Sequence, residues 1–174
     1  MANTYTLIAS STVGSGGAAS ISFTSIPNTY TDLQLVVSAR TTYAGASNSD
    51  YLYITINSDT TSANYPTKML LGNGSAANSY GNSTQRFAGD ANSSTSTANT
   101  FGNGSIYIPN YAGSAYKSLS IDAVSEANAT AVESGIVAMT WNNTSAITSI
   151  SLASGNSGNI VQYSTAYLYG VKNA

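Results

Sequence analysis

The chain has 174 residues, which is enough for one domain with a substantial hydrophobic core. Only 7% of the residues are charged, the net charge is −2, and the sequence contains no cysteine and no histidine. This composition excludes disulfides, nucleophilic catalysis by a thiolate or with an imidazole base, and a Cys/His zinc site. It also disfavours binding driven by nucleic-acid phosphates or anionic lipid, so we expect neither a nucleic-acid nor a membrane partner.

The N-terminal segment MANTYTLIASSTVGSGG has no basic region and no apolar run of signal-peptide length. No window approaches the roughly 18 apolar residues of a membrane span. We therefore expect synthesis in a cytoplasm. Because 42% of the residues are hydrophobic and 13 are tyrosines, the abundance of Ser, Thr and Asn does not indicate disorder.

The first two predicted strands cover residues 5–12 and 20–24, with a Gly-Ser-Gly-Gly turn at residues 14–17 between them. Since the segments follow one another closely, we expect a small N-terminal hairpin. A break at Ile26-Pro27-Asn28 then ends this unit.

The next two segments alternate between apolar and polar residues, as strands with one buried face do. In residues 32–41, one face carries Leu33, Leu35, Val37 and Ala39. In residues 50–57, one face carries Leu52, Ile54 and Ile56, and the other carries Tyr51, Tyr53 and Thr55.

The region from residue 58 to residue 103 is dominated by Ser, Thr, Asn and Gly, with apolar islands only at residues 69–71 and 86–88. We expect short strands there, joined by long loops. The low-complexity stretch ANSSTSTAN at residues 91–99 is predicted to be an exposed loop tip.

The clearest unit is residues 105–125, SIYIPNYAGSAYKSLSIDAVS, which reads as two strands joined by a Pro-Asn-Tyr-Ala-Gly turn. Apolar residues alternate on both arms, at Ile106, Ile108, Leu119, Ile121 and Ala123. Pro109 should end the first arm, and Gly113 is available for a positive φ in the turn.

Three segments follow this hairpin. Residues 134–141, SGIVAMTW, form a nearly continuous apolar run, which predicts a strand covered on both faces, with a helix as the weaker alternative. Residues 146–153 predict another strand. In the last predicted strand, residues 161–172, both faces are only weakly polar, and a neighbouring subunit is a candidate cover.

About nine to eleven short strands without helical periods predict an all-β, single-domain antiparallel β-sandwich, and we expect it to be jelly-roll-like. Parallel β-α-β folds are excluded because no helical segments lie between the strands.

The remaining enzymatic possibility is a pair of carboxylates, as in a glycosidase. The seven acidic residues are Asp32, Asp50, Asp59, Asp90, Asp122, Glu126 and Glu133. We interpret them as solvated turn and edge residues. Two groups could supply part of a calcium shell, Asp59 with Thr60, Thr61 and Asn64, and Asp90 with Asn92, but turn formation explains both better. We therefore predict no catalytic residue, no metal and no cofactor.

Tyrosine is the one compositional bias that suggests a function, since it combines apolar area with a hydroxyl group. It suits core capping, protein interfaces and glycan contacts, and all three roles remain open. The predicted contact residues are Tyr51, Tyr53, Tyr107, Tyr111 and Tyr116.

Three segments carry a resemblance to a known group of proteins. They are FTSIPNTYTDLQLVVSAR (residues 23–40), IPNYAGSAYKSLSIDAVSEANAT (residues 108–130) and VQYSTAYLYG (residues 161–170), together with the single Trp141 and the Asn and Thr residues after it. With these, the chain resembles small β-rich virion proteins encoded by tailed bacteriophages of aquatic bacteria. The resemblance implies a structural role on the head or tail surface and transfers no catalytic residue.

The leading hypothesis is a capsid decoration (cement) protein that is made in the host cytoplasm and carried on the virion surface. It would bind the major capsid protein or other virion proteins, as a trimer or dimer, and stabilise the shell. The alternative is a tail-fibre or baseplate module that binds host-surface glycan. A polysaccharide-degrading enzyme is the third hypothesis.

Overall fold

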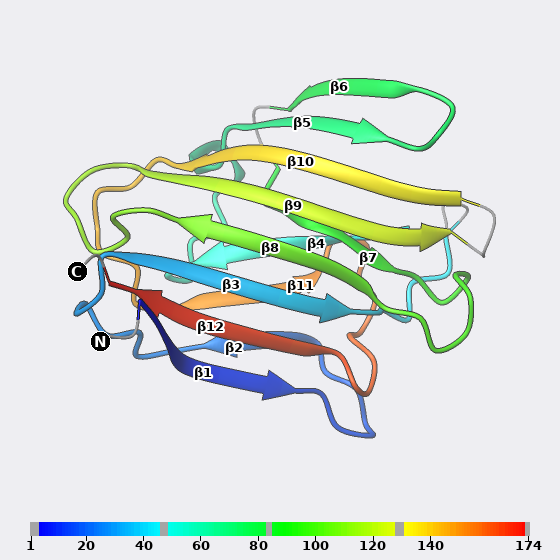
Figure 1. The fold of residues 1–174 in the computed structure, drawn as a ribbon, viewed down its shortest axis with the longest axis horizontal. Helices are drawn as coiled ribbons and strands as arrows, with labels where there is room; N and C mark the ends of the chain where they lie inside the picture. Colours follow the sequence, from blue (N-terminus) through cyan, green and yellow to red (C-terminus); the bar gives the residue numbers. More distant parts are fainter. Residues whose placement is uncertain (1–3, 46–48, 83–84, 128–130, 173–174) are drawn as a thin grey trace.

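A computed structural model of the chain describes residues 4–45, 49–82, 85–127 and 131–172. Within these ranges the regular elements are twelve strands and one 3₁₀ turn, η1 (Ser62–Asn64). The strands form two antiparallel sheets that pack face to face (Figure 1). The prediction of an all-β antiparallel β-sandwich is confirmed, with more strands than expected.

The larger sheet has eight strands and the smaller sheet has four. The larger sheet has the order β1 (Tyr5–Thr12), β12 (Thr165–Val171), β3 (Asp32–Ala39), β8 (Gly102–Ile108), β9 (Lys117–Ala127), β10 (Ala131–Trp141), β5 (Thr67–Gly72) and β6 (Ala77–Asn82). The smaller sheet has the order β2 (Ser20–Phe23), β11 (Ile150–Ser154), β4 (Ser49–Ile56) and β7 (Phe87–Asn92).

The hydrophobic core lies between the two sheets, and the predicted alternation determines which side chains enter it. In β3 and β4 every aliphatic position assigned to the buried face is buried. The sheets lie close together at Gly89 of β7, where φ is +107° and a Cβ atom would lie 2.6 Å from the Ala123 Cβ of β9. Glycine is required at this position because both the backbone conformation and the space exclude a side chain.

The predicted N-terminal hairpin is wrong, because its two arms lie in different sheets. Strand β1 pairs with β12, whereas β2 pairs with β11. The chain continues along β12 after β1, since the Val13 N–H donates to the Ser164 carbonyl and the Tyr163 N–H donates to the Val13 carbonyl, both at 2.9 Å. It then crosses to the smaller sheet through Gly17, which has φ of +69°.

The predicted central hairpin is confirmed as β8 and β9, which pair antiparallel. Its left-handed turn residue is Asn110, with φ of +49°, rather than Gly113. Asparagine tolerates this conformation, and the Asn110 N–H also donates to Oδ1 of Asp32 at 2.8 Å.

The low-complexity stretch at residues 91–99 is not simply an exposed tip. Its first residues belong to β7, and Asn92, Ser93 and Ser96 are buried. The guanidinium of Arg40 donates to four carbonyls of the following loop, those of Ser94, Ser96, Thr97 and Thr100. The loop is therefore fixed to the end of β3 by charge-assisted hydrogen bonds.

Candidate binding surface

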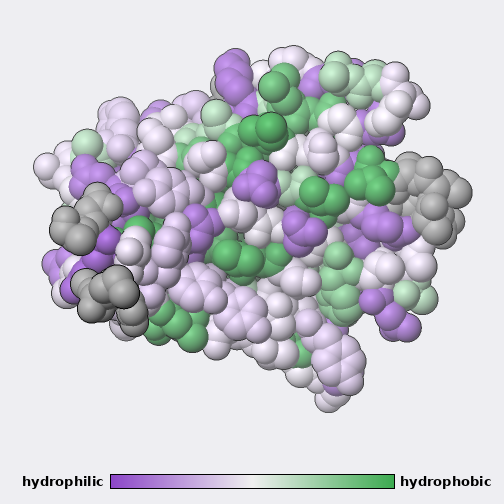
Figure 2. Space-filling view, in the orientation of Figure 1, coloured by the Kyte–Doolittle hydropathy of each residue, from purple (hydrophilic) through white to green (hydrophobic). Residues whose placement is uncertain are grey.

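Hydrophobic side chains are exposed on the side of β5, β9 and β10 that faces away from the smaller sheet. They are Leu70 (58% exposed), Val124 (37%), Val132 (56%) and Ile136 (64%), and we call this surface the outer apolar face. Ile136 lies opposite Leu70 in the β10–β5 register, so the two side chains are cross-strand neighbours. Figure 2 shows hydrophobic residues gathered over this part of the larger sheet.

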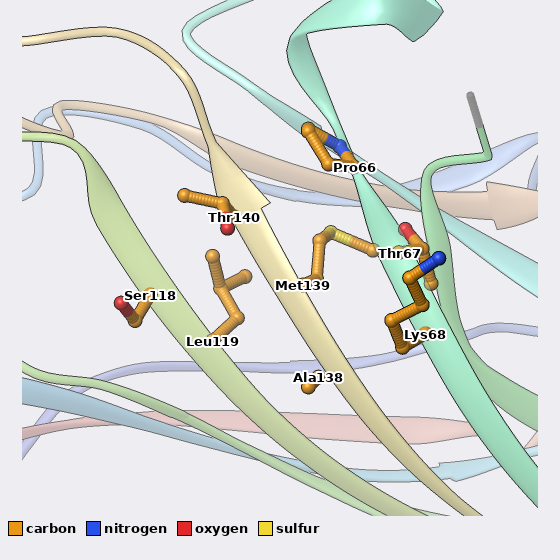
Figure 3. Close-up of a pocket in the computed structure, with 8 residues that line it drawn as sticks. All are labelled: Pro66, Thr67, Lys68, Ser118, Leu119, Ala138, Met139 and Thr140. Atoms are coloured by element: carbon orange, nitrogen blue, oxygen red, sulfur yellow. The ribbon is translucent and has the colours of Figure 1, made fainter. Parts of the chain in front are cut away.

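Two adjoining hollows, of about 320 and 200 Å³, share Lys68 and Ala138. The smaller one is lined by Leu70 and Ile136 of the outer apolar face, and the larger one lies beside that face. Figure 3 shows the larger hollow, with side chains from β5, β9 and β10 around it. Lys68 is the only charged residue that lines either hollow. The surface is thus open and carries two charges, Lys68 of β5 and Asp122 of β9, which lies opposite Ile136. Such a surface suits contact with another macromolecule better than enclosure of a small ligand.

Strand β10 shows why this face exists. Val137 and Met139 point into the core, and Ile136 and Ala138 point outward, because side chains alternate along a strand. The prediction of a strand for residues 134–141 is confirmed, but the expected cover on both faces is wrong, since only the inner face is covered within the chain.

Two predicted contact residues, Tyr51 and Tyr53, lie on β4 in the smaller sheet. Tyr51 is partly exposed and makes an edge-to-face contact with Phe87, with 5.2 Å between the ring centroids. The guanidinium carbon of Arg86 lies 5.5 Å from the centre of the Tyr53 ring. Both rings already have partners within the chain.

The other three predicted contact residues lie elsewhere. Tyr107 of β8 donates its hydroxyl to Oδ2 of Asp32 at 2.6 Å, and this bond is the main reason why its pKa is raised to about 12. Tyr111 is fully buried and donates its hydroxyl to the Pro27 carbonyl, so it is a core residue and the expectation of a contact role is wrong. Tyr116, in the turn between β8 and β9, is 62% exposed.

The five tyrosines therefore do not form one surface, and none of them belongs to the outer apolar face. Sequence reasoning missed this face because Leu70 and Ile136 are far apart in the sequence and meet only through strand pairing. The one available signal was the apolar run in residues 134–141, which indicated two covered faces.

The acidic residues are less solvated than predicted, since Asp32, Asp50 and Asp90 are buried and lie within strands. Asp59 is a turn residue, as expected. Its carboxylate accepts hydrogen bonds from the Trp141 indole, the Asn64 amide and the Thr61 N–H at 2.7–2.9 Å. Burial tends to raise the pKa of Asp59, but these bonds outweigh it and the pKa is lowered.

Asp90 has a different environment. Its Oδ2 atom is buried and has no hydrogen-bond partner, and burial, followed by the charges of Glu133 and Asp50, raises the pKa of Asp90 to about 7. The neighbouring carboxylates do have donors, because Asp50 accepts from Ser154 and Asn156, and Glu133 accepts from Ser49. Within the described ranges, no group of three or more His, Cys, Asp or Glu residues is placed to hold a metal ion.

Among the described residues, no helix has the length and apolar character needed to span a membrane. In comparisons with protein-family models, curated proteins and solved structures, nothing matches this chain significantly.

Proposed function

We propose that this protein is a bacteriophage head decoration protein, which binds the outer capsid lattice through its outer apolar face. The observation that carries the proposal is that Leu70, Val124, Val132 and Ile136 are exposed together on three adjacent strands. Such a face costs free energy in water and is stabilised when a second surface covers it.

The strand order supports the jelly-roll part of the proposal. Two hairpins, β5–β6 and β9–β10, extend the larger sheet beyond its first four strands. Without them, the strands form two four-stranded sheets, β1-β12-β3-β8 and β2-β11-β4-β7. The pairs β1–β12, β2–β11, β3–β8 and β4–β7 are then nested, as in an antiparallel ribbon wrapped into a jelly roll, a fold of viral capsid and lectin domains.

The outer apolar face lies on these two inserted hairpins. Leu70 belongs to β5, Val124 to β9, and Val132 and Ile136 to β10. A function added to a general fold commonly resides in such additions, while the rest of the fold supplies a rigid support. We therefore assign capsid contact to the hairpins and mechanical support to the eight-stranded roll.

Binding would stabilise the shell by mass action, because the protein would bind the assembled lattice and not the separate subunits. In this proposal the partner is the major capsid protein or another virion protein, and the chain binds as a dimer or trimer at symmetry positions of the shell. Apolar contacts of this kind are little weakened by salt, which suits a particle in seawater or fresh water.

The experiment is to measure the copy number of the chain in purified particles of the phage that encodes it, by quantitative gel and mass spectrometry. A decoration protein is expected on the order of hundreds of copies per particle, as the symmetry of the shell requires. A copy number of tens or fewer would favour the tail-fibre or baseplate alternative. Absence from particles, or turnover of a sugar polymer by the purified protein, would refute a structural role.

A further inference from the structure

A separate hollow of about 530 Å³ lies where the end of β3 meets the loops that precede β8 and β12. It is lined by Arg40, Asn99, Phe101, Val161, Gln162 and Tyr163. This volume lies within the range of small-molecule sites, and the lining combines aromatic rings with a few polar groups, as such sites do.

The walls of this hollow are fixed before any ligand binds. Arg40 holds the loop of residues 94–100 through its bonds to four backbone carbonyls. From the other side, the Glu126 carboxylate accepts hydrogen bonds from the Thr97 N–H at 3.1 Å and from the Thr97 hydroxyl at 2.6 Å. A preformed site of this kind loses less conformational entropy on binding.

Tyr163 is held in a costly conformation at the rim of the hollow. Its φ is +70°, in the left-handed region that tyrosine rarely occupies, and its side chain is 69% exposed. Hydrogen bonds on both sides impose this conformation, from the Val161 N–H to the Arg40 carbonyl and from the Tyr163 N–H to the Val13 carbonyl, both at 2.9 Å. A ring this exposed adds little to the core, so a tyrosine at this strained position points to a contact outside the chain.

The chemistry of the lining identifies the class of ligand. The rings of Tyr163 and Phe101 offer apolar faces on which the C–H face of a pyranose can pack, and the amides of Asn99 and Gln162 can bond hydroxyl groups. The N–H groups of Arg40 donate to backbone carbonyls, and the nearby Glu126 carboxylate offsets its charge, so an anion in the hollow gains little from Arg40. We propose that this hollow binds a neutral saccharide. The proposal goes beyond capsid contact and uses a different part of the molecule.

The test uses the full chain on an array of neutral and anionic glycans, followed by saturation-transfer NMR with the neutral sugars that bind. Tyr163→Gly removes the ring and relieves the strained φ, so the variant should fold at least as stably as the original chain. We expect it to weaken saccharide binding at least tenfold without lowering the melting temperature. Tyr116→Ala is the matched control, since Tyr116 is similarly exposed but lies at the opposite end of the larger sheet (Figure 1), and binding should be unchanged.

Three results would overturn the proposal: no neutral glycan binds at millimolar concentration, only anionic glycans bind, or Tyr163→Gly binds as well as the original chain. The copy number in virions is independent of all three results. Failure of the saccharide site would therefore leave the decoration proposal intact, and the reverse also holds.

Discussion

Strand β10 has two faces that differ in what covers them rather than in hydrophobicity. On the inner face, Val137 and Met139 pack in the core between the sheets. On the outer face, Ile136 and Val132 are both more than half exposed. The inner face is explained by the folding of this chain, whereas folding leaves most of the Ile136 and Val132 side chains in water. An apolar surface that folding does not use is best explained by binding.

The largest expected effect is a difference in stability between substitutions on the inner face and substitutions on the outer face. Ile121→Ala on the inner face of β9 removes a buried side chain and should lower the free energy of unfolding by about 2–5 kcal/mol. Ile136→Ala on the outer face of β10 removes a cross-strand contact with Leu70 and should lower it by about 1 kcal/mol or less. Urea unfolding followed by circular dichroism measures both. Similar losses in the two variants would show that the outer face is already covered.

The inner face of β10 also has a polar part, where Glu133 accepts a hydrogen bond from Ser49 and where a Cβ atom on Gly135 would lie 3.8 Å from Oδ2 of Asp90. The pKa of Asp90 is about 7 in the folded chain, against an ordinary value of 3.8, so the folded state holds a proton that the unfolded state releases between these pH values. The free energy of unfolding should therefore fall as pH rises from about 4 to about 7, by up to about 4 kcal/mol, and stay constant above that.

Asp90→Asn tests this expectation, because the amide stays neutral at every pH. The free energy of unfolding of the variant should fall much less between pH 4 and pH 7, and at pH 8 the variant should be more stable than the original chain. Asp122→Asn is the control, since Asp122 is an exposed carboxylate on β9, the strand that pairs with β10. Thermal unfolding between pH 4 and pH 8 provides the measurement, and an unchanged slope in Asp90→Asn would show that Asp90 is ionised throughout.

Arg40 stabilises a polar part of the molecule, the loop of residues 94–100, through hydrogen bonds to its backbone carbonyls. Arg40→Ala should destabilise the chain by about 2 kcal/mol, since it leaves several carbonyls of residues 94–100 without their charged donor. Faster amide hydrogen exchange confined to this loop would identify the cause. Lys172→Ala, which removes an exposed charge near the Tyr30 ring, should leave exchange in the loop unchanged.

The smallest effect on stability is expected for Ile136→Thr, which keeps a β-branched side chain in β10 but makes the outer apolar face more polar. Stability should change by less than about 0.5 kcal/mol, whereas the fluorescence of a hydrophobic dye bound to the folded protein should decrease. Ser134→Thr, at the next outward position of the same strand, is the control. Equal dye fluorescence in all three proteins would place the exposed apolar surface elsewhere.

Most of the strands could be predicted from the sequence, because alternation is a local property. Strands β3 and β4 and the β8–β9 hairpin appear with the expected buried positions. The pairing of β1 with β12 could not be predicted in this way, since the paired residues are more than 150 positions apart in the sequence. A short Gly-rich turn is compatible both with a hairpin and with a crossing between two sheets, so it could not show which connection follows β1.

The candidate site was largely hidden from the sequence for the same reason. Choosing tyrosines selected Tyr111, which the fold places in the core, and overlooked Ile136, which the fold leaves outside. The apolar run in residues 134–141 predicted a strand covered on both faces, and the structure covers only the inner one. Alternation along one strand cannot show which of its two faces the rest of the chain covers.

The most direct test is hydroxyl-radical footprinting of the chain, free in solution and on purified phage heads. We expect Leu70, Val132 and Ile136 to be oxidised less on heads than in solution, with Tyr163 equally reactive in both. Equal oxidation of the three aliphatic residues in both states would contradict the account.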